Sequence, residues 1–180
     1  MRISTHRLVF LSFLIALSII LTRILSIRIP IDGIEGVRIG FGGLPIILAG
    51  VIGGPLAGGI VGALSDLLGF FINPIGPYMP HFTLTSFLTG FIPGLLMKYI
   101  FKKKIRFYSL FTAITCGQTI TTVILVPLFI NMLFKTPLEI LFIPRVISQS
   151  ISIPLYAVFI RTLLRNDLIK SYCRGCNVSI

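Results

Sequence analysis

Three charged side chains, Arg23, Asp66 and Arg145, lie within long apolar stretches of the sequence. A charge inside a membrane-spanning segment is costly and usually faces a cavity, a substrate or another charge. The planar guanidinium of arginine binds carboxylate and phosphate groups, whereas a carboxylate accepts two parallel hydrogen bonds from the amino and ring N–H groups of a heterocycle. Two arginines against one carboxylate predict a positive pocket that prefers an anionic ligand. The alternative is that both arginines extend to the membrane interface and Asp66 neutralises one of them.

Segment 73–84, NPIGPYMPHFTL, is the most unusual part of the sequence, because it carries three prolines within seven residues. Proline has a fixed φ and lacks an N–H group, so regular structure is not expected around these positions. We expect a rigid lid that stacks its aromatic rings on a flat ligand. The residues of this segment that we predict to bind the substrate are Asn73, Tyr78, Phe82 and Thr83. The alternative is a simple connector with an aromatic belt at the membrane interface.

The elements that must position these residues are transmembrane helices. The chain has 180 residues and a mean hydropathy of +1.01, and only 12% of its residues are charged, against about 25% in an average soluble domain. Apolar windows predict six helices, at residues 8–29, 39–52, 56–72, 82–101, 107–132 and 138–164. We therefore expect an all-α integral membrane protein with a single six-helix transmembrane domain, residues 1–166, and a short cytoplasmic tail, residues 167–180.

The orientation follows from the basic residues, because cytoplasmic loops retain positive charge. One predicted side carries 11 of the 16 lysines and arginines: Arg2, Arg7, Lys98, Lys102, Lys103, Lys104, Arg106, Arg161, Arg165, Lys170 and Arg174. The other side has Arg28, Arg38 and Lys135, so both termini are expected in the cytoplasm. At about 1.5 Å of rise per residue, the three charges within the helices then fall between the middle of the membrane and its outer surface. One cavity open to the exterior is expected to hold them.

Two sets of small residues predict close helix packing. Gly54, Gly58 and Gly62 precede Asp66 at intervals of four residues, which gives the predicted third helix a ridge that another helix can approach closely. Ser12 and Ala16 form a similar pair near the cytoplasmic end of the first helix. Packing is the default meaning of such spacing, so a partner-binding role for Ser12 and Ala16 does not follow from spacing alone.

Several function classes lack their sequence motifs. The chain has no GxxxxGK(S/T) motif, so any energy from ATP must come from another protein. It has no HExxH or GxSxG motif and no histidine within a predicted helix, and Asp66 is the one carboxylate away from the helix ends, which disfavours a membrane enzyme. A soluble basic face for nucleic acid is not expected either, since the positive charge follows the membrane topology. Cys173 and Cys176 are half of a zinc site at most, so we expect no metal and no cofactor.

Three motifs make the chain similar to the folate-specific S components of energy-coupling-factor (ECF) transporters: RIGFGGLP at 38–45, GGIVGALSDLLG at 58–69, and NPIGPYMPHFTL at 73–84. The similarity resumes at residues 144–154, and it extends to the length and the expected six helices. It implies a multi-pass subunit in the plasma membrane of a prokaryote that binds folate or a related vitamin from outside. It also implies a transmembrane coupling subunit and two cytoplasmic ATPase subunits as partners. The family's first helix meets the coupling subunit through small residues, usually two alanines, and Ser12 and Ala16 occupy that place here.

The resemblance leaves alternatives open. Folate suits the predicted pocket, because its pterin edge matches Asp66 and its glutamate carboxylates match arginine. An S component for another vitamin would share the fold and the partner motif and differ only in pocket residues. A carrier or channel that works alone would need an ion pathway across the membrane, but apart from Lys98 and Arg161 near the cytoplasmic ends, the cytoplasmic halves of the predicted helices carry no charged residue to form one. An intramembrane enzyme is the third alternative.

Overall fold

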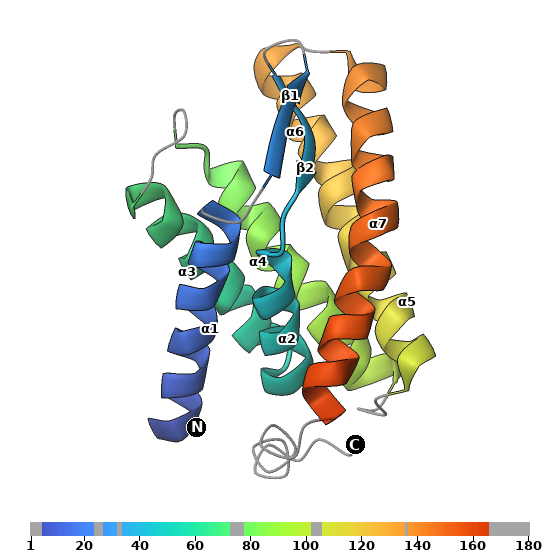
Figure 1. Cartoon of the computed structure of the whole chain (residues 1–180). Helices are drawn as coiled ribbons and strands as arrows, with labels where there is room; N and C mark the ends of the chain where they lie inside the picture. The colour runs from blue at the N-terminus through green and yellow to red at the C-terminus, as the bar shows by residue number, and fades with distance from the viewer. Residues whose placement is uncertain are drawn as a thin grey trace.

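The computed structural model describes residues 5–23, 27–31, 34–72, 78–101, 106–135 and 137–165, which form a helical bundle with one small β-hairpin (Figure 1). Its elements in chain order are α1 (Thr5–Arg23), β1 (Ile27–Ile31), β2 (Ile34–Ile39), α2 (Gly43–Gly53), α3 (Pro55–Ile72), α4 (Pro80–Leu95), η1 (Leu96–Ile100), α5 (Phe107–Gln118), η2 (Thr119–Leu125), α6 (Val126–Phe134) and α7 (Leu138–Arg165). The predicted tail at 167–180 lies outside the described residues.

The six predicted helices are confirmed as six continuous helical segments. The fourth consists of α4 and η1, and the fifth consists of α5, η2 and α6 in succession. The two η elements are π-helical turns next to prolines within these helices, at Pro93 and Pro127. Pro127 cannot donate the usual backbone hydrogen bond, so the helix changes its bonding pattern in the turn before it, which is η2. Among the residues that the structure describes, four helical stretches are long and apolar enough to cross a membrane: Thr5–Arg23, Pro55–Ile72, Phe107–Leu133 and Leu141–Arg165.

The bundle has two distinct ends (Figure 1). At the terminal end, α1 begins, α7 finishes and α2 turns into α3. A guanidinium nitrogen of Arg7 donates to the carbonyl of Gly53, which holds the start of α1 against the C-terminus of α2. At the hairpin end lie the tip of the β1–β2 hairpin and the first turn of α7, whereas α1 and α3 end nearer the middle of the view, beside the lower part of the hairpin. The prediction that the terminal end faces the cytoplasm rests on the distribution of basic residues.

Glycines bring α2, α3 and α4 close together, as the sequence predicted for Gly58 and Gly62. A Cβ atom at Gly58 would lie 2.5 Å from the Cα of Gly50 and 2.5 Å from the carbonyl oxygen of Gly90. A Cβ at Gly62 would overlap the carbonyl oxygen of Ser86. No side chain fits at these contacts, so the three backbones define the shape of this part of the bundle. Gly54 has a different role, because its φ of 90° ends α2.

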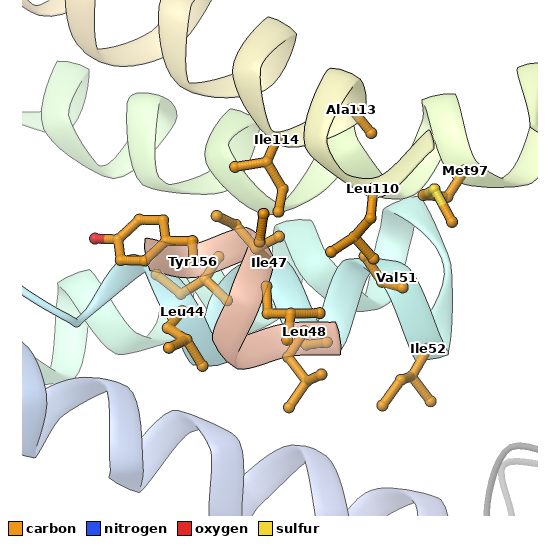
Figure 2. Packing of buried hydrophobic residues seen from close by; sticks show 14 of the residues in the cluster. Leu44, Ile47, Leu48, Val51, Ile52, Met97, Leu110, Ala113, Ile114 and Tyr156 are labelled. Carbon is orange, nitrogen blue, oxygen red and sulfur yellow. The ribbon is translucent and has the colours of Figure 1, made fainter. Parts of the chain in front are cut away.

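The centre of the bundle is α2, whose residues are all buried between Leu44 and Ile52. Figure 2 shows Leu44, Ile47 and Leu48 from this helix packed among apolar side chains of the neighbouring helices. The labelled neighbours from other elements are Met97, Leu110, Ala113, Ile114 and Tyr156. In contrast, only 11% of the most apolar window of α1 is buried, so this helix covers one side of the bundle and leaves much of its surface outward.

The sequence prediction was wrong between the first two helices. The first helix was expected to reach residue 29 and the second to begin at residue 39, but α1 ends at Arg23 and α2 begins at Gly43. An antiparallel hairpin occupies the interval, with Ile31 opposite Ile34. Its ladder is interrupted between Ile29 and Pro30, where a bulge accommodates a residue that cannot donate a ladder hydrogen bond. The isoleucines and the valine of this segment are β-branched and favour strands.

Candidate functional site

A chain of hydrogen bonds joins α3 to the start of α4. The hydroxyl of Thr83 donates to Oδ2 of Asp66 at 2.8 Å, and the hydroxyls of Tyr78 and Thr83 lie 3.1 Å apart. Because Thr83 has one hydroxyl proton and Asp66 receives it, Tyr78 must be the donor in the second bond. Asp66 is half-buried, and this arrangement fixes one of its oxygens while the carboxylate retains further capacity to accept hydrogen bonds.

Aromatic rings lie beside this chain. The rings of Phe70 and Tyr78 are 5.2 Å apart and tilted by 56°, and Phe70 also contacts Phe71 edge to face at 6.1 Å. Phe82 is half-buried in the first turn of α4, where its carbonyl accepts a hydrogen bond from Thr85. Tyr78 is 41% exposed and Phe71 is 74% exposed, so two of these rings remain accessible at the surface. Asn73, the other residue predicted in this segment, lies outside the described residues.

Arg23 lies close to the same part of α3. It is the last residue of α1, and a Cβ atom at Gly69 would lie 3.1 Å from its Nε. The guanidinium therefore crosses α3 at a glycine, less than one helical turn from Asp66 along the sequence. We call Arg23, Asp66, Tyr78 and Thr83 the α3–α4 cluster. It unites four of the seven residues predicted to bind substrate.

Arg145 belongs to a second group of polar residues, on one face of α7. Three atoms of this face are buried within the protein: Nε of Arg145, Oγ of Ser148 and Oε1 of Gln149. Within the described structure, the Ser148 and Gln149 atoms have no hydrogen-bond partner. Ser152 continues the face and is buried as well, at 5% exposure. We call these four residues the α7 polar face; they recur at intervals of three and four, which places them on one side of a helix.

Ser148 and Gln149 were not predicted from the sequence, because only charged residues were sought within the helices. Buried polar atoms almost always have a hydrogen-bond partner, so unsatisfied ones indicate a place for water or a ligand. Their relation to Arg145 at three and four residues along a helix was the signal available in the sequence. Together they offer a cationic fork, a hydroxyl and a carboxamide to one polar ligand.

Further polar residues extend from the α7 polar face into the bundle. The hydroxyl of Tyr156 donates to the carbonyl of Gly40 and so attaches α7 to the segment that follows β2. Gln118 of α5 is 3% exposed, and its Oε1 accepts a hydrogen bond from Thr122 at 2.9 Å. Tyr156 and Gln118 both lie within about 3.4 Å of the position that a Cβ at Gly43 would occupy. The start of α2 is thus enclosed by polar groups from two other helices.

The hairpin lies between the two groups of predicted residues. In Figure 1, α3 and α7 stand on opposite sides of the bundle and the hairpin rises between them. β1 follows α1, which ends at Arg23, and β2 packs against α7. The expectation that a single cavity holds Arg23, Asp66 and Arg145 stays a prediction, because the structure assigns these residues to three different helices, α1, α3 and α7.

Ser12 and Ala16, the predicted partner interface, are both exposed on the outward side of α1. The hydroxyl of Ser12 donates to the carbonyl of Leu8 at 3.0 Å, so its polarity is satisfied within the helix. Large apolar side chains surround the pair and are exposed as well: Leu8, Val9, Phe13 and Ile20. This α1 face combines small and apolar residues, a composition that suits either lipid or another transmembrane helix. Among the described residues, no group of three or more histidine, cysteine or acidic side chains is placed to hold a metal ion.

Comparisons with known proteins agree on one family. A family model described as "ECF-type riboflavin transporter, S component" matches residues 2–170. The folate transporter FolT of Clostridium novyi (strain NT) is 34% identical over 153 residues, which cover 85% of this chain and 84% of that protein. The crystal structure of FolT bound with folic acid has a TM-score of 0.73 and 27% identity, covering 87% of this chain and 90% of that one. The structure of the S component of a bacterial ECF transporter has a TM-score of 0.68 and 24% identity, covering 91% of this chain and all of that one. At this identity, the match supports a shared fold and nothing more.

Proposed function

Because the chain belongs to the family of ECF-type riboflavin transporter S components, we propose that it captures folate at its hairpin end for import driven by partner subunits. It is accordingly a multi-pass protein of the plasma membrane and a binding subunit. The observation that carries the choice of substrate is the 34% identity with a folate transporter over most of both chains. The structural similarity of this chain to a FolT bound with folic acid supports the same choice.

The chemistry of the two polar groups supports folate. Folate has a flat pterin ring with adjacent amino and N–H groups at one end and a glutamate with carboxylates at the other. In our proposal, Asp66 accepts hydrogen bonds from the pterin edge, and the rings of Tyr78 and Phe82 stack on its face. Arg23 and Arg145 attract the anionic parts of the ligand. We also assign Asn73 and Thr83 to substrate binding.

Ser148 and Gln149 are added to this site because their buried polar atoms need partners. The Oε1 atom of Gln149 accepts a hydrogen bond and so matches the N–H of folate's amide, whereas the Ser148 hydroxyl can donate to a carboxylate; a wholly apolar ligand would satisfy neither. They lie within about one turn of Arg145 on the same helix face. We propose that the α7 polar face binds the end of the ligand that carries the carboxylates.

Energy for import has to come from elsewhere, since the chain lacks a P-loop sequence. We propose that a transmembrane coupling subunit contacts the α1 face at Ser12 and Ala16 and that two cytoplasmic ATPases supply the energy. The small side chains of this pair permit close approach of another helix. With both termini in the cytoplasm, the hairpin end and its polar groups face outward to meet the vitamin.

Riboflavin is the second candidate, because the matching family model is named for it. An uptake experiment in proteoliposomes tests the folate proposal together with its energy source. The chain alone should bind labelled folate but accumulate none, whereas adding the coupling subunit and ATPases with ATP should produce accumulation. Accumulation by the chain alone would contradict the S-component mechanism. Accumulation of riboflavin but not folate by the complete assembly would leave the mechanism intact and replace the substrate.

A further inference from the structure

A groove at the terminal end has no role in the proposed capture of folate. It has a volume of about 300 Å³, lies between the start of α5 and the end of α7, and is lined by Phe107, Val158, Arg161, Thr162 and Arg165. We propose that this groove binds the phosphate headgroup of an anionic phospholipid of the membrane leaflet at the terminal end. The inference extends beyond the proposed function and does not depend on which vitamin the chain carries.

Two arginines supply the positive charge of the groove. The guanidinium carbon of Arg161 lies 5.2 Å from the centre of the Phe107 ring, a cation–π contact that restricts where the guanidinium points. Arg165 is about one turn further along α7, roughly 6 Å away along the helix axis, and it lines the same groove. Two guanidinium groups at this spacing can share a single phosphate. The hydroxyl of Thr162 already donates to the carbonyl of Val158, so the arginines are the cationic donors.

Acidic residues that would compete for these arginines belong to other parts of the described structure. Glu35 lies in β2, Asp66 in α3 and Glu139 in the first turn of α7, so none of them belongs to α5 or to the last turns of α7. Asp167 lies outside the described residues. The described part of the groove therefore carries net positive charge, as an anion site requires.

The apolar side of the groove favours a lipid over a free anion. Phe107 and Val158 line it, and Val158 is 53% exposed on the surface of α7. Other exposed apolar residues of α7 extend this surface away from the arginines: Ile147, Ile151 and Phe159. The 28 residues of α7 measure about 42 Å, enough to carry its last turns out of a bilayer core of about 30 Å. A headgroup at Arg161 and Arg165 thus leaves acyl chains room along exposed, lipid-facing side chains.

The groove lies away from the face that we propose for the coupling subunit. Figure 1 shows α1, which carries the proposed face for the coupling subunit, on one side of the bundle, and α5 and α7 on the other. Tyr108, beside Phe107, is 81% exposed and Tyr99 is 64% exposed, as expected for aromatic residues at a membrane interface. Basic pockets between transmembrane helices at the cytoplasmic surface are a known form of anionic lipid site.

Native mass spectrometry of the full-length chain in detergent tests this proposal. The chain is offered phosphatidylglycerol or phosphatidylcholine with identical acyl chains, and we expect it to retain one phosphatidylglycerol in preference. Arg161→Gln and Arg165→Gln should each reduce retention about fivefold, the effect of one basic residue near a lipid surface. Lys98→Gln is the matched control, because Lys98 is an exposed cation beside Tyr99 and outside the groove. It should change retention by less than about twofold.

Three results would overturn a lipid site in this groove. Equal retention of the two lipids by the wild-type chain would do so without any variant. Equal losses in Lys98→Gln and Arg161→Gln would show general charge attraction rather than a site. Binding of glycerol phosphate as tightly as the lipid would show a free-anion site instead. Folding of each variant is checked by its thermal unfolding, and Phe107→Leu, which removes the ring beneath Arg161, should also lower retention if the arginine variants fail to fold.

Discussion

Thr83→Val removes the hydroxyl that connects Asp66 and Tyr78 while keeping the shape of the side chain. In the native chain Thr83 donates to Asp66 at 2.8 Å, so one carboxylate oxygen is held before a ligand arrives. Without this bond the carboxylate must be ordered on binding, which costs about 1 kcal/mol for one side chain, or about fivefold in affinity. Isothermal titration of the purified chain with folate measures the change directly.

The order of the hydrogen bonds, from Tyr78 to Thr83 to Asp66, predicts how the folate affinities of related variants compare. Tyr78→Phe keeps the aromatic ring and loses only the hydrogen bond from Tyr78 to Thr83. The bond from Thr83 to Asp66 remains, so folate affinity should fall by about twofold or less. The double variant should match Thr83→Val, because Tyr78 acts through Thr83. Thr85→Val is the control, since its hydroxyl donates to Phe82 within the same helix. Tyr78→Phe with a larger loss than Thr83→Val, or an equal loss in the control, would refute the reasoning.

Three further predictions follow from other parts of the structure. Gly58→Ala should lower the free energy of unfolding by about 1 to 3 kcal/mol, because the new Cβ would meet backbone atoms. Gly69→Ala should lower it less, because its Cβ would meet the flexible side chain of Arg23. Equal losses of the two variants in thermal unfolding would contradict this. Ala16→Trp should block assembly with the coupling subunit in a pull-down while leaving folate affinity within about 1 kcal/mol of the native value. Arg145→Ala should weaken folate binding about 10- to 100-fold with assembly intact, and Arg145→Lys should restore only part, because lysine lacks the planar fork.

The sequence predicted the helix boundaries well where glycine and proline mark the ends of helices. Pro55 follows two glycines, and α3 begins at that residue, one position from the prediction. The hairpin was missed because an apolar window gives the same value to a strand and a helix. The alternation in Ile27–Ile31 and the Asp32–Gly33 pair, which is typical of a two-residue hairpin loop, were the available signals.

The site was harder to predict than the fold, because its contacts depend on how helices cross. The link between Asp66 and Thr83 exists because glycines let α3 and α4 approach closely, and no local pattern gives that register. Arg145 was recognisable as a charge in an apolar stretch. Ser148 and Gln149 were not, because uncharged polar residues are common in transmembrane helices, and only their burial next to Arg145 sets them apart.

Equilibrium titration of the purified chain with folate and with riboflavin, in the absence of ATP, tests the central claim most directly. Our account predicts saturable binding of one folate per chain, weak or no binding of riboflavin, and a folate affinity about 10- to 100-fold lower in Arg145→Ala. The Arg161→Ala variant, at the opposite end of α7, should bind folate as the native chain does. Tight binding of riboflavin without binding of folate, or equal folate losses in the two arginine variants, would contradict capture of folate at the hairpin end.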